Sequence, residues 1–340
     1  MSQVQLSGID SGLSGSGAPL LSITNLKVYF KKVKGTFARK TTFIKAVDDV
    51  SFQIRKSEVL CLVGESGSGK TTIARCVAAL QRPTSGSIVF ENQNITNLRG
   101  KNLKNYRRQV QIIFQDPFES LYSRFDVFTT IATPITELTG VDSRSELRDM
   151  VSSLLTEVGL NPAEYMHRLP HQLSGGERQR ISIARALAPS PKMLVADEPI
   201  TMLDASQRLN ILSILMQLKE RRNLSILLIT HDLASARLVS DTAAVLYRGK
   251  LVELGETDAM LSRPHHPYTN LILESTPDID APLREGQSPV GGIEESEYVS
   301  QGCVFRPRCM YATAICEEEE PQLLEKSQKH STACHNPLNT

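Results

Sequence analysis

A loop of eight residues constrains the fold of this chain more than any other feature. Residues 64–71 read Gly-Glu-Ser-Gly-Ser-Gly-Lys-Thr, after an apolar run and before a run with helical character. This is the pattern G-x-x-x-x-G-K-[ST] in its required context, a buried strand followed by a helix. Glycine lets the backbone turn so that successive N–H groups and the helix N-terminus face one anion. The loop therefore predicts a phosphate-binding site in an α/β fold.

The side chains of this loop predict how a nucleotide is held. Lys70 is expected to reach the β- and γ-phosphates, and the hydroxyl of Thr71 is expected to bind Mg²⁺. A glycine-rich loop without a catalytic role is the alternative, which the complete pattern disfavours. The other residues expected to contact the nucleotide are Gly64, Ser66, Gly67, Ser68, Gly69 and Thr72.

Continuous apolar runs predict the strands of the core. Such a run is typical of a strand buried on both faces of a parallel sheet, and the runs here occupy residues 58–64, 192–198 and 224–230. Residues 204–222 have helical periodicity and lie between the last two runs, which predicts a right-handed βαβ unit. The residues expected on the core side of this helix are Leu209, Leu212, Leu215 and Leu218.

Two other patterns predict the parts that surround this core. Alternating apolar and polar residues at 20–30 and 42–54 predict an antiparallel edge sheet, with a basic loop at 31–40 between its strands. Residues 116–185 contain helical segments and no strand signal, so we expect an inserted helical subdomain there.

The composition excludes several classes of protein. Lys and Arg total 38 against 37 Asp and Glu, so the net charge of +1 gives no broad attraction to nucleic acid or anionic lipid. No apolar run approaches the roughly 18 residues that span a bilayer, and the first residues lack the pattern of a secretory signal. We therefore expect a cytosolic chain, with the Gly- and Ser-rich residues 1–19 as a flexible leader.

Two further motifs identify a family. Residues 173–177 read Leu-Ser-Gly-Gly-Glu, and the apolar run that follows ends in the carboxylates of Asp197 and Glu198. Together with the phosphate loop, these motifs make residues 20–262 resemble the ATP-binding-cassette (ABC) ATPases. The resemblance implies a P-loop NTPase fold of class α/β, with a parallel core sheet, an antiparallel β edge and an inserted helical subdomain.

The resemblance also implies roles for residues outside the loop. Tyr29 would stack on the adenine, and Gln115 would lie at the γ-phosphate and Mg²⁺. Asp197 would hold Mg²⁺ through water, Glu198 would polarise the attacking water, and His231 would contact the γ-phosphate. The residues themselves support part of this, since adjacent carboxylates at a strand end point to opposite sides and can act on metal and water separately.

A second anion site is predicted in the helical insertion. Ser174, Gly175 and Gly176, followed by Glu177, offer a hydroxyl and backbone N–H groups at a helix N-terminus. In the family this site completes the ATP pocket of a partner subunit in a head-to-tail dimer. Asp204 is kept for subunit communication, whereas residues 200–202 read Ile-Thr-Met instead of the usual Thr-Ser-Ala. The resemblance thus implies ATP, Mg²⁺ and a second ABC ATPase subunit.

Several phrases resemble one branch of the family, the ATPase subunits of oligopeptide and dipeptide importers. The clearest is HHPYTNLILESTP, residues 265–277. This resemblance implies a nonidentical second ATPase subunit, two membrane permeases and an external solute-binding protein as partners. It also implies a place at the cytoplasmic face of the membrane, and no nucleic acid. Peptides are the expected cargo, with oligosaccharide or nickel as alternatives. A soluble ABC ATPase acting on nucleic acid or ribosomes is the rival function, but it typically carries two cassettes or a long coiled coil.

The last part of the chain, residues 263–340, is expected to be an extension that carries a metal site. Its four cysteines are Cys303, Cys309, Cys316 and Cys334. Disulfides are disfavoured in a reducing cytosol, and the spacing does not form the paired CxxC of a zinc ribbon. The family resemblance implies a [4Fe-4S] cluster, with Zn²⁺ or free thiols as the alternatives. Because these cysteines lie far in sequence from the ATP-site residues, the extension is expected not to affect ATP binding.

Overall fold

The computed structural model describes residues 18–34, 40–116, 121–275, 301–327 and 329–339. Most of the expected leader, residues 1–19, lies outside these ranges. No helix in the described ranges is both long enough and apolar enough to cross a lipid bilayer.

The core is an eight-stranded sheet in the order β11-β12-β10-β9-β3-β8-β7-β6. Its parallel part consists of β6 (Val110–Ile113), β7 (Met193–Asp197), β8 (Ser225–Thr230), β3 (Val59–Val63) and β9 (Thr242–Tyr247). The prediction of a parallel sheet from continuous apolar runs is confirmed, because β3, β7 and β8 are fully buried.

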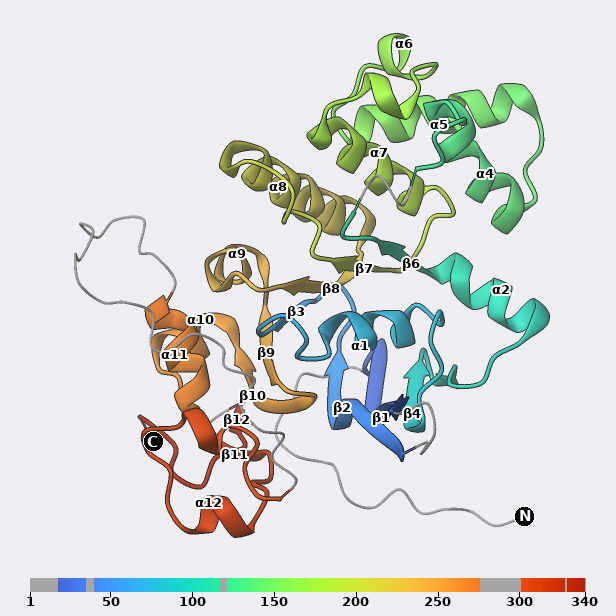
Figure 1. Cartoon of the computed structure of the whole chain (residues 1–340). Helices are drawn as coiled ribbons and strands as arrows, with labels where there is room; N and C mark the ends of the chain where they lie inside the picture. The colour runs from blue at the N-terminus through green and yellow to red at the C-terminus, as the bar shows by residue number, and fades with distance from the viewer. Residues whose placement is uncertain (1–17, 35–39, 117–120, 276–300, 328, 340) are drawn as a thin grey trace.

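Alternate residues of these strands enter two separate apolar clusters. Cys61 of β3 packs into the cluster that contains α8 (Ala205–Arg222), whereas Leu62 packs into the cluster that contains α1 (Lys70–Val77). Figure 1 shows the two helices on opposite faces of the sheet. A sheet that is covered on both faces has no polar side, which is why its strands read as unbroken apolar runs.

Helix α8 begins where the sequence predicts, with Asp204 as its N-cap accepting a hydrogen bond from the Gln207 N–H over 2.9 Å. Its buried residues include Ile211, Leu215 and Leu218, at the spacing of one helix face. The prediction that Leu209 faces the core is wrong, since its side chain is 59% exposed. Leu209 lies two residues before Ile211, which turns it about 200° away from that stripe.

The antiparallel strands form a sheet of their own, in the order β2-β1-β4-β5. It contains β1 (Leu21–Lys34), β2 (Lys40–Ile54), β4 (Ser85–Phe90) and β5 (Gln93–Asn94). The prediction of an antiparallel arrangement is confirmed, but β1 and β2 continue into the expected basic loop, where Lys31 pairs with Phe43. Both faces of this hairpin contact water, so it can carry charged residues on either face. The strands therefore continue beyond the residues in which apolar and polar side chains alternate.

Helices fill the chain between β6 and β7, as expected. They are α4 (Val127–Thr139), α5 (Arg144–Glu157), α6 (Pro162–Tyr165), η1 (Pro170–Gln172) and α7 (Gly175–Leu187). Ile131, Val151 and Ile183, from three of these helices, are fully buried in one cluster. Figure 1 shows this group of helices projecting away from the two sheets, while α2 (Gly100–Gln109) lies beside β6.

The end of the chain extends the core sheet. Strand β10 (Lys250–Glu256) pairs with β9 and with β12 (His330–Thr332), which pairs in turn with β11 (Leu324–Ser327). Short helices complete this region: α9 (Leu233–Val239), α10 (Thr257–Ser262), α11 (Pro267–Ser275), η2 (Arg306–Arg308) and α12 (Ile315–Glu318). The extension therefore contributes β11 and β12 to the same sheet as β3, the strand that precedes the phosphate loop.

Candidate functional site

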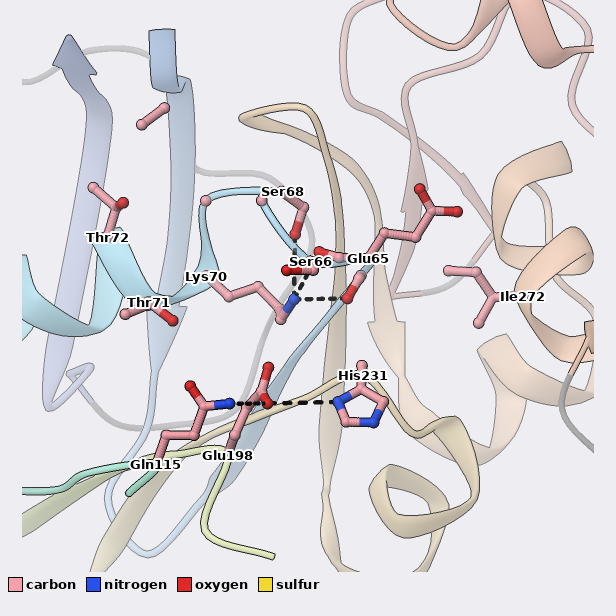
Figure 2. Close-up of a pocket in the computed structure, with 14 residues that line it drawn as sticks. Glu65, Ser66, Ser68, Lys70, Thr71, Thr72, Gln115, Glu198, His231 and Ile272 are labelled. Atoms are coloured by element: carbon pink, nitrogen blue, oxygen red, sulfur yellow. Dashed lines mark hydrogen bonds and ion pairs between the residues drawn. The ribbon is translucent and has the colours of Figure 1, made fainter. Parts of the chain in front are cut away.

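A cavity of about 740 Å³ lies over the loop between β3 and α1 (Figure 2). Its wall contains every loop residue that the sequence predicts, together with Gln115, Glu198 and His231 from the ends of neighbouring strands. Parallel strands place their carboxyl ends at one edge of the sheet, which explains why residues far apart in sequence meet here. The complete lining is Ala46, Gly64, Glu65, Ser66, Gly67, Ser68, Gly69, Lys70, Thr71, Thr72, Gln115, Glu198, His231 and Ile272.

The loop depends on glycine where its backbone turns. Gly67 and Gly69 have φ angles of 78° and 107°, in the left-handed region that other residues rarely adopt. A Cβ atom at Gly69 would lie 2.3 Å from the backbone oxygen of Ala46, so the loop also packs directly against β2. Helix α1 follows at once, and its first residues, Lys70, Thr71 and Thr72, line the cavity.

The ammonium group of Lys70 is held inside this loop. Its Nζ donates hydrogen bonds to the carbonyl oxygens of Gly64, at 2.6 Å, and Glu65, at 2.9 Å. Burial lowers the pKa of Lys70, and the nearby carboxylates of Glu198 and Asp197 act in the opposite direction. A buried cation on the wall of a polar cavity is suited to bind a multiply charged anion.

Two of the three residues expected at the Mg²⁺ site, Thr71 and Asp197, are in contact. Thr71 Oγ1 donates to Asp197 Oδ1 over 3.1 Å, which joins the start of α1 to the end of β7. Burial raises the pKa of Asp197, although the hydrogen bond from Thr71 lowers it. A hydroxyl and a carboxylate beside a phosphate site are hard oxygen ligands, so these residues fit Mg²⁺.

Three side chains converge on one oxygen of Glu198. Oε2 accepts hydrogen bonds from Gln115 Nε2, at 2.9 Å, and from Thr201 Oγ1, at 3.0 Å, while His231 Nδ1 lies 3.6 Å away. Figure 2 shows Gln115 and His231 on either side of this carboxylate. The arrangement fixes the carboxylate at the cavity wall, where it can accept a proton from a water molecule.

No role was predicted for Thr201. It lies in the segment that departs from the usual Thr-Ser-Ala of the family, yet a hydroxyl remains at this position. The signal was therefore available in the chemistry of the substitution, since serine and threonine both donate the hydrogen bond that Glu198 receives.

Tyr29 is not among the residues that line the cavity. Its hydroxyl donates to Asp48, whereas Ala46 of the same hairpin lines the cavity. Although burial raises it, the pKa of Asp48 falls to about 2 because of that hydrogen bond and the ammonium of Lys250. The adjacent Phe30 is 41% exposed. The stacking role of Tyr29 thus stays a prediction that the geometry does not support.

The predicted second anion site forms the N-terminus of α7. Ser174 Oγ accepts from the Glu177 N–H over 3.3 Å, and Glu177 Oε2 accepts from the Ser174 N–H over 2.7 Å, a complete capping box. Gly176 lies so close to Gln207 of α8 that a Cβ atom would approach its Oε1 to 2.5 Å. Residues 174–177 are not part of the lining of the cavity over Lys70.

The four cysteines of the extension come together without disulfides. The backbone N–H of Cys303 donates to the carbonyl oxygen of Cys316 over 2.8 Å. Burial raises the pKa of Cys303, Cys309 and Cys334, the last to about 11, and in each case a nearby thiol adds to the shift. These three sulfurs also accept hydrogen bonds from backbone N–H groups, which stabilise a thiolate.

The sequence missed a buried cluster beside the cysteines. In the described ranges, Glu253, His265 and His330 are the group whose ligand atoms lie within 4.8 Å of one another. The Glu253 carboxylate already accepts from the His265 N–H at 2.6 Å, the His266 N–H at 3.1 Å and His330 Nε2 at 2.7 Å. With these donors in place, Glu253 ties β10 to β12 and to the segment before α11, which is a structural role.

The extension packs beside the ATP site, which its distance in sequence did not indicate; whether it affects ATP binding stays a prediction. Arg308 Nη1 donates to both carboxylate oxygens of Glu65, at 3.0 and 2.9 Å, and the Glu65 N–H donates to Tyr268 Oη over 2.9 Å. Ile272 of α11 lines the cavity itself. Distance in sequence did not predict distance in space, because β10 and β12 fold the end of the chain back beside the phosphate loop.

Comparison with known proteins gives two matching families. Residues 47–201 match the family described as ABC transporter, and residues 252–316 match the one described as Oligopeptide/dipeptide transporter, C-terminal region. The oligopeptide transport ATP-binding protein AppF of Bacillus subtilis (strain 168) is 40% identical over 320 residues, 93% of this chain and 97% of that protein. The dipeptide transport ATP-binding protein DppF of Haemophilus influenzae is 38% identical over 317 residues, 93% of this chain and 96% of that protein.

A solved structure has the same fold over most of the chain. It is the dimeric structure of a post-hydrolysis state of the ATP-binding cassette MJ0796 bound to ADP and Pi. The two sequences are 27% identical, and the TM-score is 0.62 over 70% of this chain and 98% of that chain.

Proposed function

This chain belongs to the ABC transporter family of ATPases, and we propose that it is the subunit that powers peptide uptake through a membrane importer. The observation that carries the proposal is the meeting of Lys70, the Thr71–Asp197 pair and Glu198 at one cavity. One cation, one set of oxygen ligands for Mg²⁺ and one proton acceptor are what hydrolysis of a nucleoside triphosphate requires.

Each group has a separate task in the proposed reaction. Lys70 and the loop N–H groups bind the β- and γ-phosphates, and Thr71, Gln115 and Asp197 hold Mg²⁺. When bound, Mg²⁺ neutralises charge that develops on the phosphate oxygens. Glu198 orients the attacking water and accepts its proton, while His231 contacts the γ-phosphate and the Gln115 amide keeps the carboxylate in place.

The second anion site points to a dimer. Ser174, Gly175, Gly176 and Glu177 form a complete helix N-terminus, yet they do not line the cavity of their own chain. In our proposal they complete the ATP pocket of a partner subunit, and Asp204 at the start of α8 lies at the same interface. The relative in the solved structure is dimeric, which supports this arrangement.

Peptide is the cargo that the comparisons favour. Relatives that cover nearly the whole chain are named for oligopeptide and dipeptide transport, and the match to the C-terminal region of such transporters includes residues 252–316. Permease subunits and a solute-binding protein are the corresponding partners, with this chain at the cytoplasmic face of the membrane. Neither oligosaccharide or nickel cargo nor a role on nucleic acid or ribosomes has support among these relatives.

The four thiols can hold an iron–sulfur cluster. Their spacing in sequence does not form the paired CxxC of a zinc ribbon. Backbone N–H groups donate to the sulfurs of Cys303, Cys309 and Cys334, which is typical of iron–sulfur sites. We therefore propose a [4Fe-4S] cluster that orders the extension.

Reconstitution tests the main proposal. The full chain is combined with the permease subunits and the solute-binding protein in liposomes, and ATP hydrolysis and uptake of labelled peptide are measured together. We expect peptide to accumulate only with ATP, and Lys70→Ala to abolish both signals. Hydrolysis that responds to DNA, RNA or ribosomes in the absence of permeases would instead support the rival function.

A further inference from the structure

Glu65 places a negative charge on the wall of the phosphate site. It is the second residue of the loop, its side chain is 39% exposed, and it lines the cavity beside Lys70. An uncompensated carboxylate at this position repels a triphosphate that carries up to four negative charges. A positively charged residue near the other end of the chain balances this charge.

Arg308 is the group that compensates this charge. Its Nη1 lies 2.9 and 3.0 Å from the two oxygens of the Glu65 carboxylate, across 243 residues of sequence. The guanidinium also lies over the rings of Tyr247, at 5.8 Å, and Phe305, at 5.9 Å. The hydrogen bond with Glu65 raises the pKa of Arg308. Arg308 is therefore a fixed, permanently charged partner.

A second set of contacts seats the extension beneath the loop. Lys250 Nζ lies 2.5 Å from Glu320 of the extension and 3.0 Å from Asp48 of β2. The neighbouring Gly249 donates its N–H to the carbonyl oxygen of Ser68 in the loop over 2.9 Å. The turn between β9 and β10 thus connects the extension to the phosphate loop independently of Arg308.

We propose that Arg308 is a positioning residue for the nucleotide: by neutralising and orienting Glu65, it lets the cysteine-bearing extension set the affinity for ATP. The inference rests on the proposed ATP site and adds a determinant of its affinity. Arg308 directly precedes Cys309, so the segment that carries the thiols also carries the charge that the phosphate loop needs. An extension that is displaced leaves Glu65 facing the triphosphate.

Binding measurements on the full-length chain test this inference. ATP and inorganic tripolyphosphate are titrated against the wild type and against Arg308→Ala, Glu65→Ala and the double variant. We expect Arg308→Ala to lower the affinity for both ligands about three- to tenfold. This is the scale of the repulsion from one added like charge near the surface. Removing Glu65 as well should restore binding to about the wild-type level, because the repelling charge is gone.

The restoration separates an electrostatic role from a merely structural one. If Arg308 only anchors the extension, the double variant will bind as weakly as Arg308→Ala, which overturns the proposal. Higher salt should shrink the defect of Arg308→Ala, since exposed charges are screened, and Arg308→Lys should retain part of the affinity. Arg306→Ala, which removes the other arginine of the same short helix, serves as the matched control and should bind normally.

Lys70→Ala distinguishes a failure of this inference from a failure of the proposed ATP site. If the wild type binds ATP and Lys70→Ala does not, the proposed site stands whatever Arg308→Ala does. Normal ATP binding by Arg308→Ala then rejects this inference alone. If the wild type fails to bind ATP and tripolyphosphate, the proposed function itself fails.

Discussion

Gln115 Nε2 donates a hydrogen bond to Glu198 Oε2 over 2.9 Å, joining the segment after β6 to the end of β7 across 83 residues of sequence. Thr201 donates to the same oxygen, at 3.0 Å. Two donors on one oxygen fix the direction of the carboxylate and leave the other oxygen for a water molecule. The orientation of Glu198, the proposed base, therefore depends on Gln115, which follows β6, and on Thr201, which follows β7.

Glu198→Gln should lower the turnover of ATP by about 10²- to 10⁴-fold, the usual scale for the loss of a general base. Gln is isosteric and keeps the site filled, so ATP affinity should remain and an ATP-bound dimer should accumulate. Steady-state hydrolysis, nucleotide binding and size-exclusion chromatography measure these effects. Lys70→Ala is the contrasting variant, because it should weaken binding itself. Near-normal ATP affinity in Lys70→Ala would contradict our interpretation of the loop.

The stability of the protein should fall on acidification because of His266. Burial lowers the pKa of this residue from 6.5 to about 4, and its Nδ1 accepts the Tyr268 N–H over 3.0 Å. Between pH 6.5 and 4 the unfolded chain binds a proton that the folded chain does not, so the free energy of unfolding should fall by about 1.4 kcal/mol per pH unit. This contribution is fully present above pH 6.5 and is lost as the pH drops toward 4.

His266→Asn provides the comparison for that effect. An Asn side chain can still accept the Tyr268 N–H but does not titrate. Urea unfolding at several pH values should therefore show a shallower decline in the variant than in the wild type. Equal slopes for the two proteins would assign the acid sensitivity to other groups.

Protein purified without oxygen should be brown and contain about four iron atoms per chain, since four thiolates satisfy one cubane. Cys309→Ser should lower the iron content and the visible absorbance. Iron analysis and an absorption spectrum suffice for the measurement. Colourless protein with one zinc per chain would overturn the assignment of an iron–sulfur cluster.

A charge at Phe125 should uncouple ATP hydrolysis from transport. Phe125 is 39% exposed and lies edge to face with the exposed Tyr122, with ring centroids 4.9 Å apart, just before α4. Such exposed aromatic residues suit a contact with a cytoplasmic helix of a permease. We expect Phe125→Glu to leave the isolated chain folded and hydrolytically active while peptide uptake fails. Leu121→Glu is the contrasting variant and should unfold the chain, because Leu121 is buried.

The sequence alone determined the parts of this protein that depend on short-range pattern. The spacing of glycines around Lys70 requires one backbone path, and a strand that is buried on both faces must be apolar throughout. For that reason the sequence was enough to predict the loop, the strands β3, β7 and β8, and the start of α8 at its N-cap Asp204. The parallel order of the strands then brought Gln115, Glu198 and His231 to one edge.

Only the tertiary structure decided which distant groups meet. Nothing in the local pattern around Glu65 or Arg308 indicates their ion pair, because its two partners are brought together by the pairing of β10 with β9 and β12. The hydroxyl of Tyr29 donates to Asp48, which also pairs with Lys250. The alternating pattern of a strand does not indicate such contacts between side chains. Local periodicity encodes burial and backbone path, whereas long-range charge pairing depends on a register that only the folded sheet fixes.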